Sequence, residues 1–473
     1  MGDRIGCDSQ PYRTAKVPMT LAAAHFQQRL ETLVRECGVP GASLAVWGEG
    51  ELLEAAAGVC NLETRVPATS DTLFQIGSIT KLYTAALIMQ LVEEGKLDLD
   101  APVRKVLPEF RVKDEAVAAG VTLRQLLSHT SGVTGDFFKD AGRGEDRVAK
   151  FVSMMAGLEQ VHAPGEMFSY CNTGFVAAGR MIEVANGTTW DKAIRTRISK
   201  LLDTPAFSTL PEQAMRYQTA IGHLGAPGAL MVTPIAYLAA SNGPAGATPM
   251  AKARDIVTFA RMMMNEGVAP NGKQVLSAES VHAMHLRNVA CPKGMNIDAI
   301  GLATFMWDWD GDGHYEVFGH DGSTIGQAAW LRYHPESETA LCLLTNGGNG
   351  KAMADALIRE VFAEAAGIAP PELPTPDASL VLDAARYAGR YANSMEAIEV
   401  TAEGGKLVAT VTPSPDYAVM SGGPKRTVLE AVNTELFLGV APGMTLPQSW
   451  HFIGDEGGRA RWLHLGVRAH RRV

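Results

Sequence analysis

The chain has 473 residues, of which 46% are hydrophobic and 20% charged, and its formal net charge is −9. This composition can bury large cores, which excludes an intrinsically disordered protein. The acidic balance excludes the basic footprint that duplex nucleic-acid binding requires. We therefore expect a globular protein of about three domains, with no nucleic-acid partner.

The N-terminal segment and the cysteines indicate the compartment. Residues 1–20 contain no apolar core of the kind found in secretory signals and are expected to form a loose leader. No apolar run reaches the roughly 20 residues that span a bilayer. Six cysteines are too few for a disulfide scaffold. These features predict a cytoplasmic protein with reduced thiols and no membrane association.

The predicted elements alternate between hairpins and helices. Apolar spacing predicts a helix over 21–36, followed by a β-hairpin over 41–58. Further elements are helices over 78–94, 173–186, 251–266 and 351–366 and a second hairpin over 327–345. Because the hairpins lie far apart and helices fill the middle, we expect an α/β or α+β fold whose sheet takes strands from distant parts of the chain.

Composition changes divide the chain. The proline-rich segment 369–376 predicts a linker between a main domain at 21–368 and a C-terminal domain at 377–473. Short strand-like runs in the C-terminal domain are typical of a small antiparallel β-barrel or sandwich. Its strand edges could pair between subunits, so both a homo-oligomer and a monomer are open alternatives. In the main domain, 203–248 is expected to form long loops that shape a binding cleft.

A serine and a lysine stand at the start of the helix predicted over 78–94. Ser78 and Lys81 would lie one turn apart on one face, and a helix N-terminus favours a developing negative charge. A lysine can hold a serine hydroxyl in a reactive state, or take its proton if the lysine pKa is lowered. The ordinary alternative is an N-cap serine beside a solvated lysine.

Tyr170 and Asn172 precede the helix predicted over 173–186 and can face one cleft. A tyrosinate near a lysine is a candidate general base, and an asparagine can bind a substrate amide or carbonyl. The alternative is a tyrosine packed under a loop and an asparagine that caps the helix.

The sequence GHDGS at 319–323 lies just before the second hairpin. Its small residues let a ligand approach the backbone closely. His320 could hydrogen-bond a substrate carboxylate or support a proton path. The alternative is a turn with a surface histidine.

Together, the three motifs resemble those of the serine β-lactamase and penicillin-recognising hydrolase family. The closer likeness is to its class C-like branch, which contains β-lactamase-like esterases and D-aminopeptidases. That family carries Ser-x-x-Lys, then Tyr-x-Asn, then Lys- or His-x-Gly near its last strands. The phrases FQIGSITKLYTA, LLSHTSGV, GRMIE and LTNGG add to the likeness, which covers 20–368. The resemblance implies an antiparallel sheet with flanking helices and a helical subdomain.

The resemblance also implies roles for the motif residues. Ser78 would be the nucleophile, Lys81 would activate it, and Tyr170 would relay the proton to the leaving group and then activate water. Whether Lys81 or Tyr170 is the general base stays open. The substrate-binding residues would be Asn172, His320, Gly322 and Ser323. The backbone N–H groups of Ser78 and Ser323 would form the oxyanion hole.

The implied function is cleavage of a small-molecule ester or amide through an acyl-enzyme, without metal or cofactor. His320 stands where β-lactamases proper have lysine, which favours an esterase or D-residue peptidase over a β-lactamase. One alternative is an acyltransferase or biosynthetic tailoring enzyme that uses the same acyl-enzyme. Another is a non-catalytic assembly or binding protein. The acidic segment 308–312 resembles a calcium loop, but Gly319 replaces the glutamate that an EF-hand needs, so we expect a hairpin loop.

Overall fold

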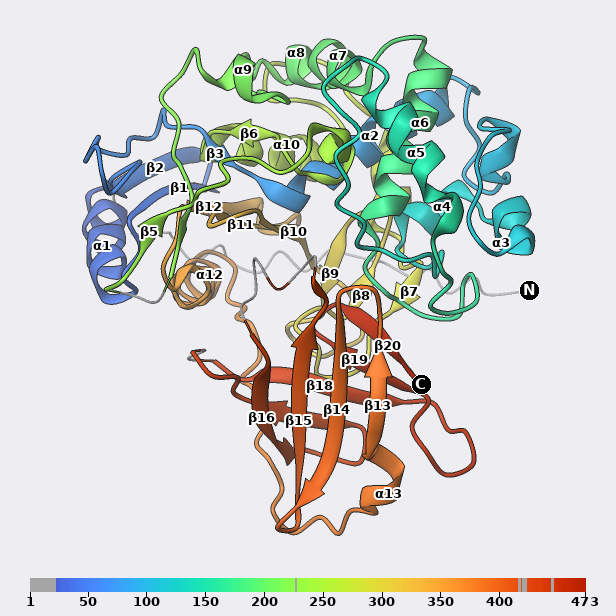
Figure 1. The fold of residues 1–473 in the computed structure, drawn as a ribbon. Helices are drawn as coiled ribbons and strands as arrows, with labels where there is room; N and C mark the ends of the chain where they lie inside the picture. The colour runs from blue at the N-terminus through green and yellow to red at the C-terminus, as the bar shows by residue number, and fades with distance from the viewer. Residues whose placement is uncertain (1–22, 226–227, 416–417, 419–422, 444–445) are drawn as a thin grey trace, which may run out of the picture.

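An eight-stranded antiparallel sheet forms the centre of the larger, N-terminal part of the chain, here called the α/β region (Figure 1). The computed structural model describes residues 23–473 except 226–227, 416–417, 419–422 and 444–445, so the leader expected at 1–20 lies outside the described residues. The strand order is β2-β1-β12-β11-β10-β9-β8-β7. The strands are β1 (Gly41–Gly48), β2 (Glu51–Gly58), β7 (Val289–Ala290), β8 (Ala299–Ile300), β9 (Phe305–Trp307), β10 (Val317–Ser323), β11 (Ala328–His334) and β12 (Thr339–Thr345).

Both predicted hairpins are confirmed, and they pair with each other. β1 and β2 form the first, β11 and β12 form the second, and β1 pairs with β12 at the register Leu44↔Leu343. The sheet thus joins strands from the two ends of the α/β region, as the distribution of hairpins predicts.

Helices cover both faces of this sheet. Side chains alternate along a strand, so Leu44 and Leu343 pack in one core with α1 (Ala23–Glu36) and α12 (Gly350–Ala365). Ala45 and Cys342 face the opposite core, with α2 (Thr80–Glu93) and α10 (Ala253–Met264). Figure 1 shows α1 and α12 below the sheet and α10 above it. Two buried faces explain why β12 is buried along its whole length and apolar between its terminal threonines.

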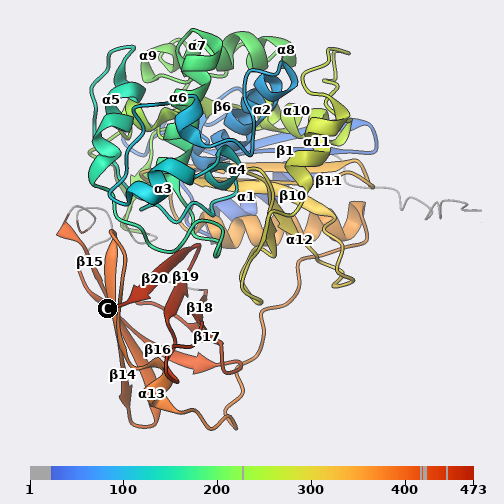
Figure 2. The same ribbon diagram turned by 90° about the vertical axis from the view of Figure 1, so that its right-hand side faces the viewer.

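A helical subdomain packs beside α2 (Figure 2). Its centre is α6 (Asn172–Asn186), which ends at Gly187 in the left-handed conformation, φ 68°, as the Asn-Gly pair predicts. The shorter helices are α3 (Glu115–Gly120), α4 (Leu123–Leu127), α5 (Arg147–Met154), α7 (Trp190–Ala193), α8 (Lys200–Leu202), α9 (Pro211–Ala214) and α11 (Ala278–His285). Within the described ranges, no helix combines the length and the apolar character that crossing a bilayer demands.

The segment 203–248 contains only short elements in its described residues. They are a two-stranded sheet formed by β4 (His223–Leu224) and β5 (Met231–Val232), the helix α9, and the 3-10 helix η5 (Ala240–Ala245). η5 packs against α2 and α6, so the loops expected here pass directly beside the first two motifs.

The C-terminal part of the chain is a closed barrel of eight antiparallel strands, drawn in orange and red in Figure 1. The strands are β13 (Gly389–Ala392), β14 (Glu396–Glu403), β15 (Lys406–Pro413), β16 (Lys425–Ala431), β17 (Leu436–Gly439), β18 (Gln448–Ile453), β19 (Trp462–Leu465) and β20 (Arg468–Arg472). Tyr387, Tyr391, Phe437 and Phe452 fill its interior.

The last strand of the barrel was not predicted. The charged segment RAHRR forms β20, and its strand character is hidden because only Ala469 and His470 of its five residues are buried. The pairing of β13 with β20 closes the barrel. Its described strands therefore leave no free edge with which a second subunit could pair. The expectation that strand edges could join subunits is thereby removed. A homo-oligomer stays a prediction.

Candidate active site

The residues of the first motif meet at the start of α2. Ser78 lies in the 3-10 turn η1 (Gly77–Ile79), which leads directly into α2. The helix predicted from residue 78 thus begins with a tighter turn. Lys81 is fully buried, and its Nζ lies 3.0 Å from Ser78 Oγ. The alternative of a solvated lysine is therefore wrong.

The contacts of Lys81 define what its amine can do. Nζ donates to Asn172 Oδ1 at 2.7 Å and to the carbonyl oxygen of Ala245, in η5, at 2.5 Å. Burial is the largest effect on the Lys81 pKa and moves it well below the usual range; the positive charge of Arg468 lowers it further, while Asp136 acts against both. A neutral amine has two N–H groups and one lone pair. In that neutral form the two carbonyl oxygens would take both N–H groups, and the lone pair would be left for Ser78.

The second motif lies on the other side of Lys81. Cys171, not Asn172, is the N-cap of α6, because its Sγ accepts the N–H of Gly174. Asn172 is the first helical residue, and its Nδ2 donates to Asp136 Oδ1 at 2.9 Å. The centroid of the Tyr170 ring lies 4.8 Å from Lys81 Nζ. Tyr170 and Asn172 thus face one site.

Tyr170 keeps its proton in the free protein. Burial raises its pKa above the usual range, and a hydrogen bond with the Ser78 side chain opposes this shift only in part. The hydroxyl lies 3.4 Å from His320 Nε2. A tyrosinate is therefore not the resting state, and the hydroxyl is placed to pass a proton between Ser78 and a neighbouring group.

His320 lies on β10 and is fully buried, so the alternative of a surface histidine is wrong. Its Nδ1 contacts the Asp321 carbonyl oxygen. Since a carbonyl only accepts, Nδ1 carries the hydrogen and Nε2 is free to accept from Tyr170. Burial is the largest effect on the His320 pKa and moves it well below its usual range. A neutral imidazole thus borders the site.

Glycines let β10 touch the turn that carries the serine. A Cβ on Gly322 would lie 2.0 Å from the Ile76 carbonyl oxygen and 3.1 Å from the Ser78 nitrogen. A Cβ on Gly77, which has φ +51°, would lie 2.4 Å from the Ser323 nitrogen. This contact brings the backbone at Ser78 close to the backbone at Ser323.

Four further groups border this site, and the sequence motifs predicted a role in the site for none of them. Asp136 and Arg468 form an ion pair beside Asn172. The Ala245 carbonyl binds Lys81. His129 stacks on the Tyr170 ring, with centroids 4.2 Å apart, and its Nδ1 accepts the Cys171 N–H at 2.9 Å. Only His129 had a local signal, the LLSHTSGV phrase; the others are joined to the motifs only by the fold.

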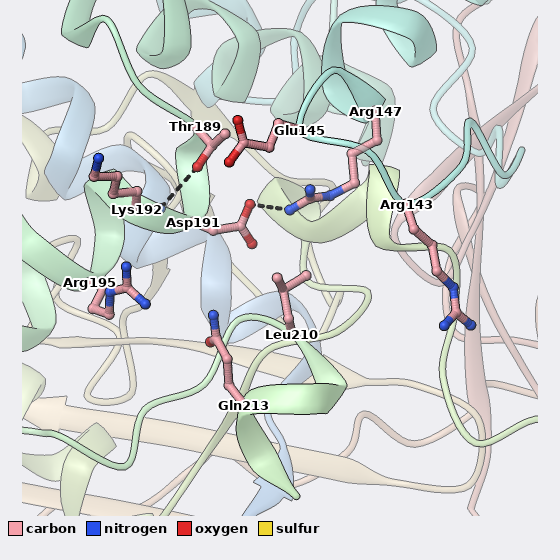
Figure 3. A pocket seen from close by; sticks show the side chains of 9 residues that line it. All are labelled: Arg143, Glu145, Arg147, Thr189, Asp191, Lys192, Arg195, Leu210 and Gln213. Carbon is pink, nitrogen blue, oxygen red and sulfur yellow. Dashed lines mark hydrogen bonds and ion pairs between the residues drawn. The ribbon is translucent and has the colours of Figure 1, made fainter.

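Two other charged features lie apart from the three motifs. Among the described residues, the carboxylates of Asp308, Asp310 and Glu316 lie close enough together to hold a metal ion, with ligand atoms within 4.8 Å. A surface pocket on the helical subdomain contains the buried Arg147–Asp191 ion pair, surrounded by further charged side chains (Figure 3). None of these residues belongs to a motif.

Comparison with known proteins agrees with this geometry. The sequence profile described as Beta-lactamase matches residues 24–366. The chain belongs to the beta-lactamase family. Members of this family are serine hydrolases, and the antiparallel sheet with flanking helices is the expected beta-lactamase-like fold, here followed by a closed barrel.

Three beta-lactamase-like relatives illustrate the range of similarity. Penicillin-binding protein 4 of Amycolatopsis lactamdurans is 43% identical over 373 residues, 78% of this chain and 97% of that protein. SurE, known from a crystal structure, is 30% identical in sequence, and its structure matches with a TM-score of 0.77 over 95% of this chain and 99% of SurE. A second crystal structure, of SurE with D-Leu, matches with a TM-score of 0.74 at 31% identity. A D-stereospecific amidohydrolase from Streptomyces sp. is 28% identical, with a TM-score of 0.57 over 73% of this chain and 99% of its own.

Proposed function

We propose that the protein cleaves a small ester or amide through an acyl-enzyme on Ser78. The observation that carries the proposal is the contact between Ser78 Oγ and a buried Lys81 amine whose other bonds go to two carbonyl oxygens. An amine held in this way can take the serine proton, which makes the hydroxyl a nucleophile. We therefore assign the general base of acylation to Lys81.

The remaining groups complete the reaction. Ser78 Oγ bonds to the substrate carbonyl carbon as its proton moves to Lys81 Nζ. The backbone N–H groups of Ser78 and Ser323 stabilise the oxyanion, for which one donor is typically worth roughly 3 kcal/mol. The proton taken by Lys81 is relayed through Tyr170 to the leaving group as the carbon–leaving-group bond breaks, which leaves Lys81 neutral again. In the second half-reaction, water attacks the acyl carbon and gives up a proton, which Lys81 and Tyr170 relay to Ser78 Oγ as the bond between this oxygen and the acyl carbon breaks. The chemistry needs no metal or cofactor.

The substrate class that fits best is an ester or amide of a D-residue. Support comes from relatives: one solved structure holds SurE with D-Leu, and another relative is named a D-stereospecific amidohydrolase. Neutral His320 replaces the cationic lysine of β-lactamases, so the site lacks one charge that would attract a β-lactam carboxylate. We therefore rank D-residue amides and esters above β-lactams, with Asn172 and His320 as the substrate contacts.

The first test is the intact mass of the protein after exposure to a fluorophosphonate. We expect one adduct on the wild type and none on Ser78→Ala. Ser153→Ala is the matched control, because Ser153 lies exposed on α5 and its hydroxyl, among the described residues, bonds the Ala149 carbonyl alone. An unlabelled wild type would contradict the proposal and favour a binding or assembly role.

A second measurement defines the acceptor and the stereochemistry. Esters and amides of D- and L-leucine should be compared, with and without an added amine. Faster release from the D-compounds supports the substrate class, whereas equal rates contradict it. A new amide formed with the amine would show acyl transfer in place of hydrolysis.

A further inference from the structure

The barrel touches the loop that carries the second motif. The N–H of Tyr170 donates to the Val467 carbonyl oxygen at 2.8 Å, and the Ala469 N–H donates to Ser169 Oγ at 3.2 Å. His464 Nε2 contacts the Phe168 carbonyl oxygen at 3.0 Å. Figures 1 and 2 both show β19 and β20 at the end of the barrel that faces the α/β region. The strand ends of the barrel thus hold the backbone on which Tyr170 sits.

A chain of side-chain bonds continues from the barrel to the lysine. Arg468, at the start of β20, donates to both carboxylate oxygens of Asp136, at 2.5 and 2.9 Å. Asp136 accepts from Asn172 Nδ2 at 2.9 Å, and Asn172 Oδ1 accepts from Lys81 Nζ at 2.7 Å. The Asp136 side chain is only 4% exposed. Side-chain bonds therefore link a barrel residue to the amine beside Ser78.

This chain fixes the orientation of one amide. An asparagine amide has a donating and an accepting end that are nearly equal in size, so its neighbours decide which way it points. A carboxylate only accepts, so Asp136 holds the Nδ2 end of Asn172 and turns Oδ1 toward Lys81. If the amide were reversed, the Nδ2 donor would face the Lys81 amine and compete for its lone pair.

The pair also balances charge at the site. Arg468 lowers the Lys81 pKa and Asp136 raises it, so the two effects oppose each other while both residues are present. The groups with charge or a titratable proton that act on Lys81 or border it are Asp136, Arg468, Tyr170, Cys171, His129 and His320. Only Arg468 among them comes from the barrel, and loss of either member of the pair would leave the other uncompensated.

We propose that Asp136 and Arg468 are positioning residues for the reaction, and that the C-terminal barrel is thereby part of the catalytic apparatus. The inference rests on the proposed function at Ser78. In this view the barrel holds Asn172, and through it Lys81, in the geometry of acylation. Neither Asp136 nor Arg468 needs to touch the reacting atoms.

The test uses the full chain with Asp136→Asn and Arg468→Gln, alone and together. Readouts are the rate of fluorophosphonate labelling at Ser78, kcat and KM for the best leucine ester, and the pH profile of kcat/KM. Misplacement of a reacting group costs on the order of tenfold to a hundredfold, and we expect kcat to fall within that range while KM changes little. Activity is lost on the acidic side of the profile where Lys81 becomes protonated, so Arg468→Gln should move this acidic limb to higher pH and Asp136→Asn should move it to lower pH. The double variant should lie between them.

Two further variants separate positioning from charge and from folding. Arg468→Lys keeps the positive charge but loses the bidentate hydrogen bond to Asp136, so it should lower kcat without moving the pH profile. Arg426→Gln removes an exposed ion pair with Glu403 on the barrel and should change neither. Wild-type rates and profiles in both Asp136→Asn and Arg468→Gln would overturn the inference. Failure of the proposed function would look different, because wild-type Ser78 would then not be labelled.

Discussion

Replacing Lys81 by methionine tests whether the buried amine is neutral. The folded pKa of Lys81 is lowered, so over the window from that pKa up to about 10.4 the unfolded chain binds one proton more than the folded chain. Folding stability then rises with pH, by at most about 1.4 kcal/mol per pH unit. Methionine has a similar shape and no proton to lose. The free energy of unfolding of the wild type minus that of Lys81→Met should therefore rise across this window and level off above it.

Denaturant unfolding at several pH values between about pH 7 and pH 10 measures this difference. Lys351→Met is the matched control, because Lys351 is an exposed lysine on α12 paired with Asp355. Its stability should run parallel to the wild type as pH changes. If the Lys81→Met curve also ran parallel to the wild type, the amine would carry the same proton in both states, and Lys81 could not be the resting base. Lys81→Met should in addition lose at least about a hundredfold in labelling rate.

Three other changes have defined outcomes. Tyr170→Phe should lower kcat by about a hundredfold or more, since it removes proton relay; unchanged turnover would assign the relay to Lys81. Gly322→Ala should lower kcat by about a hundredfold, because its Cβ would meet the Ile76 carbonyl oxygen at 2.0 Å, whereas Gly120→Ala, with nothing within 4 Å, should have wild-type rates. EDTA should leave ester turnover unchanged, and a loss of activity would implicate the acidic loop 308–316.

Local pattern predicted the frame of the molecule well. The two hairpins, the helix that follows Ser78 and the helix after Tyr170 all have strong periodicity or clear end signals, such as Gly95 and Gly187, which both adopt positive φ. Strand β13, with four residues, and the charged β20 offered neither. Closure of the barrel depends on these two strands, so the sequence could not distinguish a barrel from a sandwich.

The residues of the candidate site also fall into those that the sequence could predict and those that it could not. Ser78, Lys81 and Tyr170 belong to short motifs, so they could be singled out before their contacts were known. Asp136 and Arg468 lie 332 positions apart in the sequence, and no local rule links them. Their pairing depends on how the barrel docks, which is a property of two surfaces and not of any segment.

The sequence nevertheless indicates a buried lysine, because Lys81 is a charged residue within an otherwise uncharged, largely apolar helix. Eleven other residues of α2 are also buried, and its run TKLYTAALIMQL is otherwise uncharged. A charge on the inside of such a helix is costly unless it is paired or neutralised, and a lysine retained there marks a site where stability has been given up for chemistry. The structure adds the means of neutralisation: burial and Arg468 lower the Lys81 pKa, while Asn172 and Ala245 satisfy its two N–H groups. The helix alone could predict the problem, but its solution needs the loop of η5, the second motif and the barrel together.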